Sequence, residues 1–354
     1  SATLSKAKRP LVIVGGEGWD SDACSKLEQF ATTWNIPVAT SFRAQDRINN
    51  NNTNYVGDVG IGINPKLAQN IKHADLIICI GARLGEITTS NYTLIKNSSS
   101  TQKLVHIYSQ EEELGRVYVP YLGIHAGVKQ FLEMAVSLSI LPGKWNEWTS
   151  STRTDYVSWS EYATKTPGKL NLGNIIIWLR NNIPHDSIIC NGAGNFSAWL
   201  HRFYRYPIYR TQLAPTSGSM GYSVPAAVSA KLLNPMRHVI AITGDGDFMM
   251  HGQEFATAMK YGLNIIVILI NNNMYGTIRM HQERTYPGRI SGTNLYNPDF
   301  SKLAQSYGGY GECVEETDAF PGAYERALDA KRPAIIELKT DPQAITPNLV
   351  LSNM

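Results

Sequence analysis

Residues 238–276 read HVIAITGDGDFMMHGQEFATAMKYGLNIIVILINNNMYG, and their pattern indicates the class of fold. Two short runs of apolar residues, at 238–244 and 264–270, flank a helical pattern at 251–262. Runs of this kind are typical of buried parallel strands joined by a crossover helix. The first run ends in Gly-Asp-Gly and the second in Asn-Asn-Asn, so polar residues gather where the predicted strands end.

These polar residues predict a metal and phosphate site. In an open parallel sheet the carboxyl ends of neighbouring strands meet at one crevice, so we expect Asp245 and Asn272 to face one another. A carboxylate and an amide oxygen suit Mg²⁺ or Ca²⁺, which complete their shell with carbonyls, water and phosphates. Gly244 and Gly246 allow a close backbone approach to a diphosphate. Either motif alone is most often a plain turn, and the pairing of the two favours the site.

The same alternation of strands and helices extends through both halves of the chain and predicts the α/β class. We expect two doubly wound, mainly parallel sheet domains, of which the first is Rossmann-like. The predicted boundaries are a central domain at 1–140, a linker at 141–169 and a diphosphate-binding domain at 170–354. Further strands are predicted at 11–16, 37–42, 74–84, 103–108, 186–192 and 334–340, and further helices at 20–34, 64–74, 125–140 and 221–233.

Composition narrows the function classes. Apolar residues make up 43% of the 354 residues and the net charge is +3, which argues against nucleic acid or a membrane surface as a partner. No apolar run approaches the roughly 18 residues of a membrane span. The four cysteines, Cys24, Cys79, Cys190 and Cys313, lack metal-ligand spacing, so reduced thiols and a cytoplasmic protein are expected.

The segment 238–276 resembles the thiamine diphosphate signature of acetolactate synthases and related lyases, in which GDG is followed by NN. The resemblance implies that Mg²⁺ is bound by the Asp245 carboxylate, the Asn272 side chain and the main-chain carbonyl of Met274. It also implies that the diphosphate lies along Gly246, Asp247 and Gly276.

Two upstream segments carry the same resemblance. LAPTSGSMGYSVPAA, residues 213–227, is similar to the family's GSMG turn. This implies that Met220 wedges between the two cofactor rings and imposes their bent shape, while Gly218 and Met220 main-chain groups bond the aminopyrimidine. CNGAGNFSAW, residues 190–199, is similar to a loop that contacts the diphosphate, which implies a contact from Asn195. Acetolactate synthases usually carry Gln-His at Asn195-Phe196, so this loop departs from their pattern.

The resemblance covers essentially the whole chain, as a central domain followed by a diphosphate-binding domain. It implies a thiamine diphosphate- and Mg²⁺-dependent transferase or lyase that forms or cleaves carbon–carbon bonds of 2-oxo acids. The family's pyrimidine-binding domain, whose glutamate activates the cofactor, has no counterpart in these residues. We therefore expect the pocket to be completed by such a domain from the same or a neighbouring subunit of a homodimer or homotetramer. Turnover by this chain alone is expected to be negligible.

Other features leave alternatives open. His281 stands where acetolactate synthases typically carry a tryptophan, and it is a candidate acid/base or carboxylate-binding group in a predicted polar loop. FAD would occupy the central domain in that family, but Leu84-Gly85-Glu86 replaces the family's acidic-Arg segment, which favours a structural role. A noncatalytic thiamine diphosphate-binding module and an FAD- or nicotinamide-dependent oxidoreductase are the competing hypotheses. VIVGGEGW at 12–19 lacks the GxGxxG spacing that the last would need.

Overall fold

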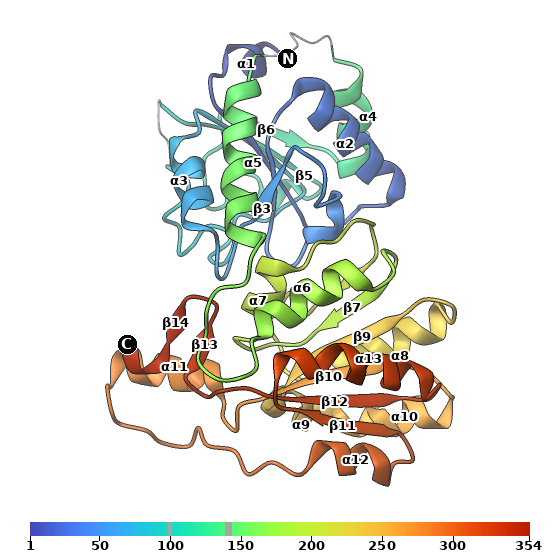
Figure 1. The fold of residues 1–354 in the computed structure, drawn as a ribbon. Helices are drawn as coiled ribbons and strands as arrows, with labels where there is room; N and C mark the ends of the chain where they lie inside the picture. The colour runs from blue at the N-terminus through green and yellow to red at the C-terminus, as the bar shows by residue number, and fades with distance from the viewer. Residues whose placement is uncertain (98–100, 139–143) are drawn as a thin grey trace. The chain divides into compact units, whose positions relative to one another are not determined.

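The computed structural model describes residues 1–97, 101–138 and 144–354. They form two compact units (Figure 1). The N-terminal unit comprises Ser1–Glu161 and Arg205–Tyr209, and the C-terminal unit comprises Tyr162–Tyr204 and Arg210–Met354. Each unit contains its own six-stranded sheet, so the prediction of two α/β domains is confirmed.

The N-terminal sheet has the strand order β3-β2-β1-β4-β5-β6, and all of its neighbouring strands pair in parallel. This order reverses between β1 and β4, as in Rossmann-like sheets, so that prediction is confirmed too. The strands are β1 (Pro10–Val14), β2 (Val38–Thr40), β3 (Tyr55–Asp58), β4 (Leu76–Ile80), β5 (Lys103–Tyr108) and β6 (Leu122–His125). The helices are α1 (Ala2–Lys6), α2 (Ser21–Trp34), α3 (Pro65–His73), α4 (Val128–Val136) and α5 (Asn146–Ser160).

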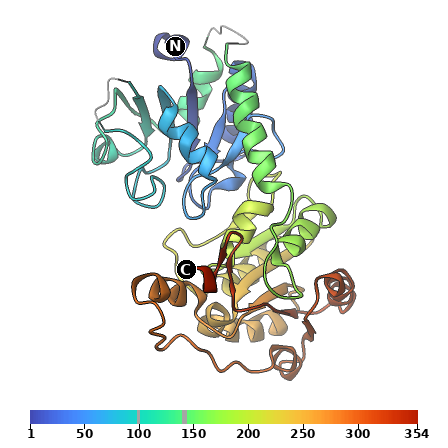
Figure 2. The same cartoon turned by 60° about the vertical axis from the view of Figure 1, so that its left-hand side comes forward.

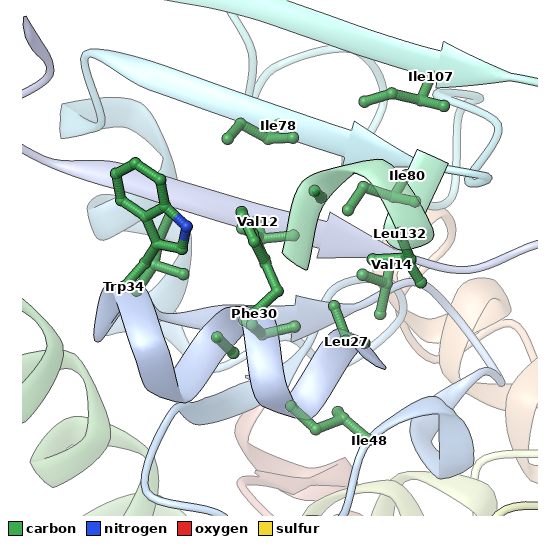
Figure 3. Close-up of a cluster of buried hydrophobic side chains, with 14 of the residues drawn as sticks. Val12, Val14, Leu27, Phe30, Trp34, Ile48, Ile78, Ile80, Ile107 and Leu132 are labelled. Atoms are coloured by element: carbon green, nitrogen blue, oxygen red, sulfur yellow. The ribbon is translucent and has the colours of Figure 1, made fainter. Parts of the chain in front are cut away.

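One buried cluster of this unit forms where α2 and α4 pack on one face of the sheet. Leu27, Phe30 and Trp34 recur at helical spacing along α2 and are buried, together with Leu132 of α4. They meet the side chains of β1, β4 and β5 that point to the same face (Figure 3). The apolar stripe of α2 therefore docks the helix on the sheet.

Within the predicted linker at 141–169, residues 146–160 form α5, which belongs to the N-terminal unit. The segment is rich in Ser, Thr and Trp and shows little amphipathic periodicity, so its residues alone do not predict a helix. Its anchors are aromatic: Trp145 stacks on Trp34 and Tyr156 meets Tyr55 edge to face. The predicted helix at 125–140 is confirmed as α4, and residues 139–140 lie outside the described part.

The C-terminal sheet has the order β11-β12-β10-β9-β7-β8 and is also parallel throughout. The strands are β7 (Ile188–Asn191), β8 (Gln212–Leu213), β9 (Val239–Gly244), β10 (Ile266–Asn271), β11 (Tyr310–Val314) and β12 (Ala334–Lys339). The helices are α6 (Leu172–Asn182), α7 (Ser197–Phe203), α8 (Ser223–Leu233), α9 (Asp245–His251), α10 (Phe255–Lys260), α11 (Gly276–Thr285), α12 (Phe300–Ser306) and α13 (Phe320–Asp329).

Helices cover both faces of this sheet. Residues of α8, α10 and α12 join one buried cluster with β7, β9 and β10. On the opposite face Trp178 of α6 packs against Phe320 and Tyr324 of α13. A short antiparallel hairpin of β13 (Ala344–Thr346) and β14 (Leu349–Val350) lies beside α11, as Figures 1 and 2 show. The hairpin brings the last residues of the chain to the carboxyl edge of the sheet.

The parallel register aligns the ends of the two central strands. Ile270 pairs with Gly244, so β9 and β10 finish at the same level. The helix predicted at 251–262 begins earlier than expected: α9 starts at Asp245, directly after the strand, and α10 follows a 3₁₀ turn. Asp245 and Asn272 each follow the end of one of these neighbouring strands, so both lie at the same edge of the sheet.

Candidate functional site

Asp245 occupies the first position of α9 and is buried. Its Oδ1 accepts the amide of Gly246 at 2.9 Å, and its Oδ2 accepts the side-chain amide of Asn297 at 2.8 Å. Burial raises the pKa of the Asp245 carboxyl above its ordinary value, while these two donors oppose the shift by bonding the charged form. Each carboxylate oxygen retains a second lone-pair direction that can face a cation.

Asn272 follows β10 and its side chain is held by the local turn. Its Oδ1 accepts the amide of Met274 at 3.2 Å, which leaves the second lone pair of that oxygen. The residue between them, Asn273, has a φ of 57°, a left-handed conformation that asparagine tolerates better than most residues. The turn therefore fixes where the Asn272 oxygen points.

A downstream segment, residues 293–297, runs beside this turn, and we call it the backing segment. Met274 and Asn294 pair in an antiparallel bridge. The flanking bonds, each 2.9 Å long, run from the Tyr275 amide to the Thr293 carbonyl and from the Leu295 amide to the Asn273 carbonyl. In this pattern Met274 belongs to a non-hydrogen-bonded pair, so its carbonyl points away from the backing segment and is available to a cation.

Asp247 connects three segments around the site. Its Oδ1 accepts the amides of Gly221 at 2.7 Å and Ala193 at 3.2 Å, and its Oδ2 accepts the hydroxyl of Thr243 at 2.6 Å. The side chain is buried. The resemblance placed Asp247 along the diphosphate, and the structure adds that its carboxylate organises the loops around the site.

The turn that precedes α8 carries Met220. Gly221 directly follows Met220, has a φ of 83° and donates its amide to Asp247. Met220 is half-buried and lines a cavity. Gly218 is exposed and is not among the residues that line this cavity. The structure thus brings Met220, but not Gly218, to the same cavity as the ends of β9 and β10.

The cavity gathers nine of the predicted residues. They are Asn195, Met220, Gly244, Asp245, Gly246, Asp247, Asn272, Met274 and Gly276. Asn195 is oriented by the hydroxyl of Thr277, which donates to its Oδ1 at 2.9 Å. Sequence reasoning missed several lining residues, among them Thr277 on α11 and Ile345 of the C-terminal hairpin. Trp199 also lines it, and its buried indole N–H has no hydrogen-bond partner within the described part of the chain.

His281 lies apart from these residues. The predicted polar loop is helix α11, on which His281 is exposed, and it is not among the cavity-lining residues. On the same helix Arg279, whose guanidinium could otherwise bind a carboxylate, is buried in an ion pair with Glu283 at 2.6 Å. The Arg279 guanidinium lowers the pKa of Glu283 below its ordinary value. Both charges of this pair are therefore engaged within one helix.

Among the described residues of the N-terminal unit, the start of α2 differs from the pyrophosphate site of a dinucleotide-binding domain. In such domains the phosphates face the helix after the first strand, here α2. Asp20 caps this helix: its carboxylate accepts the amide of Ala23 at 2.8 Å and contacts Lys129 at 2.5 Å. A carboxylate at that position repels a phosphate. Gly16 is also in backbone contact with Gly81, since an added Cβ would lie 1.9 Å from the Gly81 carbonyl oxygen.

The donors in the C-terminal unit suit Mg²⁺ and a diphosphate. They are one carboxylate, one side-chain amide oxygen and one main-chain carbonyl, all oxygens, as this cation prefers. Within the described ranges no three His, Cys, Asp or Glu side chains gather as a metal site. Three such oxygens would fill only part of the octahedral shell of Mg²⁺, and phosphate oxygens and water could complete it.

Comparison with known proteins defines the class. The family model described as thiamine pyrophosphate enzyme, C-terminal TPP binding domain, matches residues 192–338. The model described as thiamine pyrophosphate enzyme, central domain, matches residues 1–135. The chain thus belongs to the thiamine pyrophosphate enzyme family, and its C-terminal unit contains that family's cofactor-binding domain.

The similar curated proteins are acetolactate synthase large subunits. That of Corynebacterium glutamicum is 30% identical over 346 residues, which are 94% of this chain and 55% of that protein. That of Cyanidium caldarium is 28% identical over 342 residues, or 94% of this chain and 58% of that protein. A probable one from Methanococcus aeolicus is 27% identical over 376 residues. The chain is acetolactate synthase-like, and it spans little more than half the length of these relatives.

Proposed function

We propose that this chain binds thiamine diphosphate through Mg²⁺ held by Asp245, Asn272 and the Met274 carbonyl. The observation that carries the proposal is that these residues, from the ends of two neighbouring strands, line one cavity together with Met220. When bound, the cofactor supplies a thiazolium carbon that adds to the carbonyl of a 2-oxo acid and accepts electrons from it. The reaction class is the formation or cleavage of carbon–carbon bonds.

The residues of this chain would bind and orient the cofactor. Asp245 and Asn272 would fix the metal, and the metal the diphosphate. Met220 would set the angle between the two rings, and the apolar wall at Ile270 and Ile345 would exclude water. None of these groups matches the activating glutamate of the family. We therefore propose that a pyrimidine-binding domain, from the same longer protein or a neighbouring subunit of a dimer or tetramer, completes the site.

Calorimetric titration with thiamine diphosphate, with and without Mg²⁺, tests the binding. The wild-type chain should bind only when Mg²⁺ is present, and Asp245→Ala and Asn272→Ala should lose this binding. Asp318→Ala is a matched control, because Asp318 is an exposed aspartate of the same unit that does not line the cavity. Equal binding by the wild-type chain and Asp245→Ala would overturn the proposal.

Turnover tests the reaction. With pyruvate, thiamine diphosphate and Mg²⁺, residues 1–354 alone should release CO₂ no faster than the cofactor in buffer. Addition of a pyrimidine-binding domain from an acetolactate synthase should raise the rate. Substantial turnover by the chain alone would contradict the division of roles between the two domains.

The proposed setting is a reducing compartment such as the cytoplasm. All four cysteines are free thiols, and Cys24, Cys79 and Cys190 are buried. Burial raises the pKa of Cys24 and Cys79 to about 12, which keeps both protonated and unreactive. None of the helices built from the described residues is long and apolar enough to cross a membrane.

A further inference from the structure

The side chain of Asn297 links the ends of the two central strands. Its Nδ2 lies 2.8 Å from Asp245 Oδ2, 3.0 Å from Asn271 Oδ1 and 3.2 Å from Asn273 Oδ1. Because all three neighbours are oxygen acceptors, the side-chain atom of Asn297 among them must be the nitrogen that donates, and this fixes the orientation of its amide. Asp245 is the first residue of α9, directly after β9, and the other two acceptors flank Asn272 at the end of β10.

Two features hold Asn297 in place. It ends the backing segment, whose main chain is bonded to the turn at 273–275. It also precedes Pro298, and the residue before a proline is restricted to extended backbone. The side chain is thereby aimed at the strand ends by backbone constraints from both sides.

A hydrogen bond to Glu337 holds the side-chain amide of Asn271 in one orientation. Asn271 Nδ2 donates to Glu337 Oε1 at 2.6 Å, so its Oδ1 must face Asn297. Glu337 lies on β12 and is only 1% exposed, and its charge is paired with Lys339 at 2.5 Å. A buried carboxylate on the next strand therefore sets the orientation of the Asn271 amide.

We propose that Asn297 is a positioning residue for the metal site, which rests on the function proposed above. By tying Asp245 to both neighbours of Asn272, it fixes the separation of the two side-chain ligands. A site of fixed size favours the small, strictly octahedral Mg²⁺ over the larger and more adaptable Ca²⁺. The geometry thus assigns to Asn297 both cation affinity and cation selectivity.

The test compares Asn297→Ala with Asn294→Ala. Asn294 is an exposed asparagine of the same backing segment, so its substitution controls for loss of a polar residue there. Thiamine diphosphate binding is measured by calorimetry while Mg²⁺ or Ca²⁺ is varied. Asn297→Ala should raise the half-saturating Mg²⁺ concentration by about 10- to 100-fold, the usual effect of removing a residue that orients metal ligands. The half-saturating Ca²⁺ concentration should rise less, and Asn294→Ala should match the wild type.

Asn297→Ser provides a milder variant in case the alanine variant unfolds. Its hydroxyl is a single donor on a shorter side chain, so an intermediate loss of Mg²⁺ affinity is expected. Equal losses of Mg²⁺ and Ca²⁺ affinity, or values that match Asn294→Ala, would overturn the assignment of Asn297. Failure of the wild-type chain to bind the cofactor with either cation would instead overturn the proposed function.

Discussion

The Asp247 carboxylate accepts the amide of Gly221 at 2.7 Å, which joins the start of α9 to the turn that carries Met220. A hydrogen bond thus connects the helix that begins at Asp245 to the turn of Met220, the residue proposed to bend the cofactor. The same carboxylate bonds Ala193 in the loop that contains Asn195. A substitution at Asp247 should therefore disturb three parts of the site together.

Replacement of Asp247 by alanine should destabilise the chain by about 3 kcal/mol, because two buried amides lose a charged acceptor. Asp247→Asn should cost about 1 kcal/mol, since Oδ1 can still accept both amides. Its amide would donate to Thr243, whose hydroxyl also lies 3.3 Å from the Gly244 carbonyl. Denaturant unfolding followed by circular dichroism measures both values. Equal losses for the two variants would contradict this role of the carboxylate.

Gly192→Ala should be strongly destabilising. A Cβ at Gly192 would lie 1.8 Å from Asp247 Oδ2, deep in the loop region. Such overpacking costs about 2–3 kcal/mol and should displace the carboxylate from its partners. Gly85→Ala is the control, because nothing lies within 4 Å of a Cβ there. Thermal unfolding compares the two, and similar melting temperatures would refute the close packing at Gly192.

Thr277→Val should weaken thiamine diphosphate binding by about fivefold, or about 1 kcal/mol. The valine retains the shape of the side chain but removes the hydroxyl that holds Asn195 Oδ1. Thr285→Val, at an exposed position of the same helix, should leave binding unchanged. Calorimetric dissociation constants in saturating Mg²⁺ make the comparison. An unchanged constant for Thr277→Val would show that Asn195 needs no such support.

Asp58 should make stability fall as the pH rises. Burial raises the pKa of this carboxyl to about 7, so the folded chain retains its proton where the unfolded chain has lost it. Stabilisation by the protonated form is complete below about pH 4 and is lost as the pH rises towards 7, with a change on the order of 2–4 kcal/mol. Asp58→Asn should remove this dependence. The free energy of unfolding is measured by denaturation at pH 5 and pH 8 for the wild type and Asp58→Asn. The same change between the two pH values in both proteins would contradict the prediction.

Local sequence patterns predicted the central features of the C-terminal unit. Strands β9 and β10 are short, apolar and bounded by Gly-Asp-Gly and Asn-Asn-Asn, so both their existence and the place of Asp245 and Asn272 could be inferred. Parallel pairing then brings such ends together in any sheet of this class. The two-domain α/β architecture followed from the same alternation.

The remainder depends on contacts distant in sequence. Helix α5 has no apolar stripe, and its position comes from Trp145 and Tyr156 packing against aromatic residues far upstream. Asn297 precedes a proline in a polar stretch, which by itself indicates only a turn. Glu337 did carry a signal, since an acid within the apolar run at 334–338 is unusual, but its partner Asn271 is 66 residues away.

The bridge between Met274 and Asn294 orients the main-chain carbonyl of Met274. Its direction depends on the pairing of two segments and not on which side chain residue 274 carries. The Met274 side chain can therefore change to another apolar group without altering what the backbone offers to a cation. Changes in the chain between β10 and the backing segment have a larger effect than a change of side chain, because they decide whether the pairing forms. Insertions near Gly288, within this intervening segment, should be tolerated. Insertions within 293–297 should break the pairing and so change the direction of the Met274 carbonyl.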